Sequence, residues 1–117
     1  MSTRCQIGFY SEDGEDLSLF SAMLYRHCDG YPDGNGVMAD MKRDLGAMSR
    51  NELRDAEFAA AAFIEKSKPG TYGVTTGLHG DESYFYAVSP KRIRVFSAAE
   101  RFEDMTEHPS SEFQFIK

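Results

Sequence analysis

The sequence predicts an α+β fold, in which an antiparallel sheet of about five strands carries two helices packed on one face. Segments with apolar side chains at every second position precede residue 27 and follow residue 71, whereas residues 37–68 repeat apolar side chains at helical spacing. Strands in two groups around a block of helices are typical of this class. The expected element order is ββααβββ, followed by a short helix and a strand near the C-terminus.

Two strands are expected at the N-terminal end. The first covers residues 5–10, where the odd-numbered residues share one apolar face. An acidic turn at 11–16 follows, and the second strand begins near Met23. We expect Met23, Tyr25 and His27 to point inward and the even-numbered residues outward, because this register best matches the apolar face of the first strand.

Two helices are expected next. The first begins near Asn35, and the second begins at Ser49-Arg50-Asn51-Glu52, which has the form of a capping box, and ends at Pro69-Gly70. Each helix has an apolar stripe that should pack on the sheet. The stripe of the first consists of Val37, Met38, Met41, Leu45 and Met48, and that of the second of Leu53, Ala56, Ala60, Phe63 and Ile64.

Alternating segments dominate the C-terminal third. Residues 71–79, 83–88 and 92–96 are expected to form an antiparallel meander, with a hairpin turn at Gly80-Asp81-Glu82. Ser97-Ala98-Ala99-Glu100 repeats the capping-box form and predicts a short helix through Phe102. The last strand is expected at 112–116.

The chain is organised around residues 24–36, where an apolar and aromatic run gives way to turn-forming residues. Gly30 and two further glycines allow backbone angles that side chains forbid, and a proline fixes its own φ, so the segment should follow one path. That path would present four side chains together, those of Arg26, His27, Asp29 and Tyr31. Such a corner is either a structural turn or a binding site, and the sequence leaves both open.

Composition narrows the function classes. The chain has 117 residues, which fit one domain over residues 1–117 without a metal or disulfide, so Cys5 and Cys28 are expected as free thiols. Its 19 acidic and 13 basic residues give a net charge of −6, which disfavours binding to nucleic acid or to an anionic membrane. No signal core or membrane span is visible, so a cytoplasmic protein with a neutral or basic partner is expected. A homodimer is left open.

Acidic side chains gather in two places along the chain. They could form a surface that imitates the phosphate row of nucleic acid and binds a basic groove. The alternative is an ordinary solvated surface. The loop acids are Glu12, Asp13, Glu15 and Asp16, and the tail acids are Glu100, Glu103, Asp104 and Glu107.

The sequence contains none of the common catalytic or phosphate-binding motifs, so we expect neither an enzyme nor a bound cofactor or metal. His27 and Cys28 are strand neighbours that point to opposite faces, which excludes a thiol–imidazole pair. Asp29, Asp33 and Asn35 offer oxygen ligands, but their spacing is not that of a calcium loop, and turn capping explains them.

A second pair of residues could complete a site at the corner. If their strands are neighbours, His79 and Asp81 would join His27 and Asp29 in an imidazole–carboxylate site for a polar ligand or for acid–base chemistry. The alternative is that both aspartates stabilise turns and that His79 is a solvated hairpin residue.

The segment Tyr25-Arg26-His27-Cys28-Asp29-Gly30-Tyr31-Pro32-Asp33-Gly34 resembles a family of small proteins of phages, prophages and bacterial mobile elements. Their signature is an aromatic residue followed by His-x-Asp-Gly-Tyr-Pro, an acidic residue and Gly. The segments Met1–Arg4, Thr75–Glu82 and Tyr84–Tyr86 also look like this family. The chain departs from it at Cys28, where Trp or Ser is more usual.

The phage setting, small size and acidic balance look like those of anti-CRISPR and other anti-defence proteins, which occlude a defence protein or sequester a signalling nucleotide. The resemblance implies a non-enzymatic inhibitor that occludes a bacterial defence complex, CRISPR-Cas-like, in the host cytoplasm. The expected partner-binding residues are Glu12, Asp13, Glu15, Asp16, Arg26, His27, Asp29 and Tyr31. The alternatives are a signalling-nucleotide binder that uses the turn at 27–31, or a hydrolase that uses His27 and Asp29.

Overall fold

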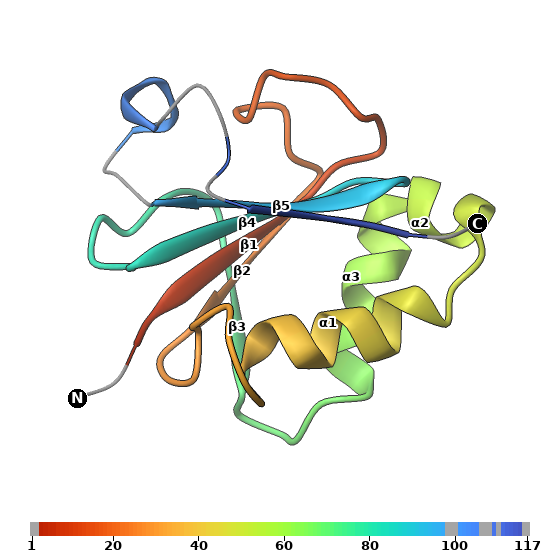
Figure 1. The fold of residues 1–117 in the computed structure, drawn as a ribbon, viewed down its shortest axis with the longest axis horizontal. Helices are drawn as coiled ribbons and strands as arrows, with labels where there is room; N and C mark the ends of the chain where they lie inside the picture. Colours follow the sequence, from red (N-terminus) through yellow and green to blue (C-terminus); the bar gives the residue numbers. More distant parts are fainter. Residues whose placement is uncertain (1–2, 98–100, 106–108, 110, 116–117) are drawn as a thin grey trace.

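A computed structural model describes residues 3–97, 101–105, 109 and 111–115. It confirms the α+β class: a mixed sheet of six strands carries three α-helices on one face (Figure 1). The elements are β1 (Cys5–Phe9), β2 (Ala22–Arg26), α1 (Val37–Gly46), α2 (Arg50–Arg54), α3 (Ala56–Glu65), β3 (Tyr72–Thr75), β4 (Tyr84–Val88), β5 (Arg92–Ser97), the 3-10 helix η1 (Phe102–Asp104) and β6 (Ser111–Gln114).

The strand order is β3-β2-β1-β4-β5-β6, and β1 and β4 are parallel while the other neighbours are antiparallel. The predicted wholly antiparallel sheet and the predicted β3–β4 hairpin are therefore wrong. Burial accounts for the difference, because Phe85, Tyr86 and Ala87 of β4 are fully buried and need a central position, whereas Val74 of β3 is exposed at the edge. The β4–β5 hairpin is as predicted.

The helical region matches the prediction with one correction. Ser49 caps α2 with a complete capping box, in which its hydroxyl accepts from the Glu52 N–H and the Glu52 carboxylate accepts from the Ser49 N–H. The single second helix that was predicted is two helices, because Asp55 leaves the helical region with φ −87° and ψ 76°. Leu53 of α2 and Ala56 of α3 are both buried in the helix-side core.

The sheet is buried on both faces, and this overturns the predicted register of β2. Ile7 of β1 lies opposite Leu24, and both pack with the helices, whereas Met23 belongs to a second core on the other face. Loop 10–21 and η1 cover that second face (Figure 1). Because both faces of β2 are apolar, alternation along the strand did not distinguish them.

The C-terminal predictions are partly tested. β6 confirms the last strand, and its Phe113 lies opposite Ile93 of β5. The capping box predicted at 97–100 lies outside the described residues except for Ser97. Over the described residues, no helix has both the length and the apolarity that a membrane crossing requires.

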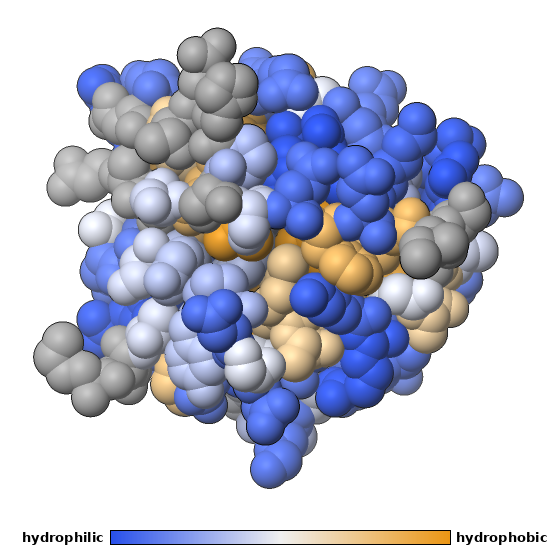
Figure 2. All heavy atoms as spheres, in the orientation of Figure 1, coloured by the Kyte–Doolittle hydropathy of each residue, from blue (hydrophilic) through white to orange (hydrophobic). Residues whose placement is uncertain are grey.

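One side of the molecule exposes the seam between the layers. Figure 2 shows apolar side chains gathered between the sheet and α1, with hydrophilic side chains above and below them. Lys42 of α1 lies over this seam, with its ammonium 4.9 Å from the ring centroid of Phe113. The seam therefore continues the helix-side core to the surface.

The two cysteines are free and differ in their exposure to solvent. Burial raises the pKa of the Cys5 thiol from 9.0 to about 12, while Cys28 is exposed. We expect one thiol to react rapidly with a disulfide reagent in the native protein, and none in Cys28→Ser. Rapid reaction of Cys28→Ser would contradict the burial of Cys5.

The folded state holds the Cys5 proton more tightly than the unfolded state does. Above the unfolded pKa of this thiol and up to about pH 12, the free energy of unfolding should therefore fall by about 1.4 kcal/mol per pH unit as the pH rises.

Candidate functional site

The corner after β2 has one defined backbone path. Asp29 takes a left-handed conformation with φ 57°, and its carbonyl accepts from the Val37 N–H at the start of α1, at 2.8 Å. The Gly30 N–H donates to the Thr3 carbonyl at 2.9 Å, and the Gly30 carbonyl accepts from the Tyr86 hydroxyl at 2.7 Å. The corner is therefore tied to β4, to α1 and to the chain before β1.

The four side chains that the corner was expected to present separate into two groups. Arg26 lies on the helix side, where its Nη1 donates to the Tyr72 hydroxyl at 2.8 Å and to Asp40 at 3.2 Å. Asp29 joins it with a 3.9 Å ion pair and accepts from the Tyr31 hydroxyl at 3.3 Å. His27 packs edge-on against the Tyr25 ring, whose centroid lies 4.9 Å from its own.

Tyr25 contacts three of the four residues expected in the imidazole–carboxylate site, and the fourth, Asp29, lies with Arg26. The His79 ring stacks on Tyr25 at 4.0 Å, and the Tyr25 hydroxyl lies 3.0 Å from both oxygens of Asp81. Partial desolvation and the Asp81 carboxylate raise the pKa of the Tyr25 phenol. The buried Gln6 amide holds the turn through the Gly77 carbonyl and the His79 N–H. His27 and His79 thus both contact the Tyr25 ring, and neither forms an ion pair with a carboxylate of the described residues.

A cavity of about 630 Å³ opens on the helix side of the corner, between the end of β2, α1 and the loop from α3 to β3. We call it the corner cavity. Four basic side chains line it, together with His27, Asp29 and Asp40. The basic residues are Arg26, Arg43, Lys66 and Lys68.

The loop acids lie at the opposite end of the sheet. β1 and β2 are antiparallel, with Phe9 opposite Ala22 and Cys5 opposite Arg26, so loop 10–21 and the corner lie at opposite ends of this strand pair. Their separation is about 13 Å along the strands. The expected partner-binding residues therefore form two separate surfaces.

Three of the four loop acids have intramolecular roles. Glu15 forms ion pairs with Arg92 at 3.4 Å and Arg94 at 3.5 Å. Asp16 accepts from the N–H and the hydroxyl of Ser18, and these bonds lower the pKa of its carboxyl group. Asp13 accepts from the Lys91 N–H at 3.2 Å. Glu12 is exposed and forms no ion pair with any residue that the structure describes.

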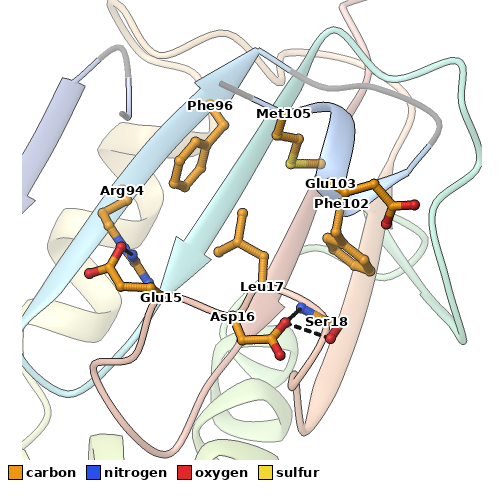
Figure 3. Close-up of a pocket in the computed structure, with 9 residues that line it drawn as sticks. All are labelled: Glu15, Asp16, Leu17, Ser18, Arg94, Phe96, Phe102, Glu103 and Met105. Atoms are coloured by element: carbon orange, nitrogen blue, oxygen red, sulfur yellow. Dashed lines mark hydrogen bonds and ion pairs between the residues drawn. The ribbon is translucent and has the colours of Figure 1, made fainter. Parts of the chain in front are cut away.

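Beside these acids lies a pocket of about 480 Å³ with apolar walls, which we call the loop pocket (Figure 3). Leu17, Phe96 and Met105 point into it, and Phe102 closes one side (Figure 3). Three carboxylates surround the opening, those of Glu15, Asp16 and Glu103. The tail acid Glu103 thus joins the loop acids, whereas Glu100 and Glu107 and the Asp104 side chain lie outside what the structure describes.

Arg94 is the residue that sequence reasoning missed at this pocket. Its side chain is only 3% exposed, its Nη2 donates to the Gly14 carbonyl at 2.8 Å, and desolvation lowers the pKa of its guanidinium. A charged residue at every second position of the apolar strand 92–96 was the available signal, because a buried charge needs a partner. The ion-pair partner of Arg94, Glu15, was predicted to bind a partner protein and not to pair within the chain.

Several features bear on chemistry. No group of three or more His, Cys, Asp or Glu side chains in the described part of the chain is placed to hold a metal ion. The loop pocket is apolar with an acidic rim, and the corner cavity is basic.

No protein-family model matches the chain, and neither a curated protein nor a solved structure is significantly similar to it.

Proposed function

We propose that this protein is a non-enzymatic inhibitor of phage or prophage origin that binds and occludes a basic surface of a bacterial defence complex in the host cytoplasm. The observation that carries the binding role is the loop pocket, where an apolar floor is surrounded by Glu15, Asp16 and Glu103. The defence-complex target rests on the sequence resemblance alone.

The loop pocket suits a basic side chain of a partner protein. The aliphatic stem of a lysine or arginine would pack on Leu17 and Phe96, while its charged end would reach Asp16 and Glu103 at the rim. Glu15 is already neutralised by Arg92 and Arg94. Asp16 forms no ion pair with a described residue, and the ion pair of Glu103 with Arg101 is exposed to solvent on both sides. These two acids therefore carry most of the charge that a partner can reach at the opening, and Glu12 extends it along the loop.

Charge reversal at the two most suitable acids should abolish partner binding. The variant is Glu12→Lys/Glu103→Lys, because among the described residues Glu12 has no ion-pair partner and Glu103 has Arg101, which is itself exposed. Reversal of all four loop acids is unsuitable, since a lysine at position 15 would face buried Arg94. Immobilised wild type and variant are exposed to bacterial lysate, and the captured proteins are quantified by mass spectrometry.

The control is Glu57→Lys/Glu65→Lys, which makes the same charge change on exposed positions of α3. We expect it to capture the same complex as the wild type, and we expect capture to weaken steeply with added salt. Inhibition should saturate near equimolar protein. Retained capture by the folded loop variant contradicts the proposed surface, and full inhibition at a small fraction of the target concentration contradicts the non-enzymatic role.

A further inference from the structure

The corner cavity is basic in a protein that is acidic as a whole. Its lining carries four basic and two acidic side chains, although the chain has a net charge of −6. Arg26 and Arg43 are balanced, because they share Asp40 and pair further with Asp29 and Asp44. Lys66 and Lys68 form no ion pair with any described residue. The uncompensated positive charge of the cavity therefore comes from these two lysines.

Arg26 supplies a fixed donor on the floor of the same cavity. Its Nε donates to the Cys28 carbonyl at 2.6 Å and its Nη1 is held by Tyr72 and Asp40, so the guanidinium has one orientation. Nη2 has Asp29 as its described partner, at 3.9 Å, which is beyond hydrogen-bond distance. Desolvation lowers the pKa of Arg26, but Tyr72 and Asp40 more than offset this effect, so the side chain stays charged.

The carbonyl groups where α3 ends and leads into the cavity wall already accept hydrogen bonds. The last carbonyls of α3 already accept bonds: that of Phe63 from the Ser67 hydroxyl, and that of Ile64 from the Ser67 N–H. The Lys68 carbonyl likewise accepts from the N–H and hydroxyl of Thr71. These bonds only partly offset the negative end of the α3 dipole, which disfavours an anion, so the attraction has to come from the basic side chains.

We infer that the corner cavity binds a small phosphate-bearing molecule, held by the Lys66 and Lys68 ammonium groups and by Nη2 of Arg26. A planar guanidinium whose Nη2 makes no hydrogen bond to a described residue, beside two exposed ammonium groups, matches the oxygens of a phosphate group. The volume of about 630 Å³ exceeds what phosphate alone fills and lies in the range of small-molecule sites. This site is separate from the loop pocket and does not depend on the proposed inhibitor role.

The test is a titration of the uniformly ¹⁵N-labelled protein at low salt, with inorganic phosphate and adenosine 5′-monophosphate as the two probes. We expect saturable shifts of the backbone amides of residues 26–29, 66–68, 70 and 71. In Lys66→Gln/Lys68→Gln the affinity should fall about tenfold or more, because two charge-assisted contacts are lost. Both lysines are exposed, so this variant should fold normally.

The control variant Lys42→Gln/Lys91→Gln removes the same charge outside the cavity and should bind like the wild type. Tighter binding of the nucleotide than of phosphate would show that the rest of the cavity contributes, and equal binding would show recognition of phosphate alone. The inference is overturned if neither probe gives saturable shifts at millimolar concentration, if both double variants weaken equally, or if the shifted amides lie outside the cavity.

Discussion

Gly30→Val should lower the free energy of unfolding by about 1–3 kcal/mol or more, and the melting temperature by roughly 10 °C. A Cβ atom at Gly30 would lie 2.7 Å from the Cys5 Cβ and 2.9 Å from the Thr3 carbonyl oxygen. The Cys5 Cβ is fixed to the first residue of β1, and the Thr3 carbonyl belongs to the chain just before that strand, so neither can move without disturbing the start of β1. The reason is close packing and not backbone strain, because the positive φ angles of the corner are at Asp29 and Gly34.

Gly73→Val is the matched control, since it makes the same substitution in a strand where a Cβ meets no atom within 4 Å. Its melting temperature should stay near that of the wild type or rise, because valine favours strands. Thermal unfolding followed by circular dichroism measures both variants. If the two variants melt at the same temperature, the corner does not contact β1 as described.

Arg26→Leu should destabilise the fold by about 2–4 kcal/mol. The Arg26 side chain is 9% exposed and links the Cys28 carbonyl, the Tyr72 hydroxyl and Asp40. Its removal leaves these acceptors without their charged donor, and Asp40 is only 30% exposed. Chemical denaturation should show the loss as a lower midpoint.

Arg4→Leu provides the comparison, because Arg4 pairs with Asp81 across two side chains that are 46% and 48% exposed. An exposed ion pair contributes about 0–1 kcal/mol, so this variant should unfold near the wild-type midpoint. Equal destabilisation by the two substitutions would mean that the Arg26 network contributes no more than a surface ion pair.

Local patterns in the sequence predict the individual elements well. Ser49 and Glu52 specify a helix start because both halves of the capping box lie within four residues. The spacing of Val37, Met41 and Leu45 predicts α1, since a helix places side chains four residues apart on one face. The class α+β follows from the order of such segments.

Partner choice between strands was decided by tertiary packing. β3 and β4 are neighbours in sequence and alternate in the same way, but β4 is central and pairs parallel to β1 while β3 lies at the edge. The predicted register of β2 was likewise wrong, because Met23 and Leu24 are both buried, in different cores. Alternation identifies a strand, but it does not say which strand lies beside it.

At the candidate sites, too, some properties follow from the local sequence and others from tertiary packing. The sequence by itself determined which residues carry charge and that the corner turns sharply, because composition and turn-forming residues are local properties. Only the tertiary structure placed Glu103 beside Asp16, Arg94 against Glu15, and Lys66 and Lys68 beside Arg26. These residues are far apart in the chain, and the packing of sheet, helices and loops brings them together.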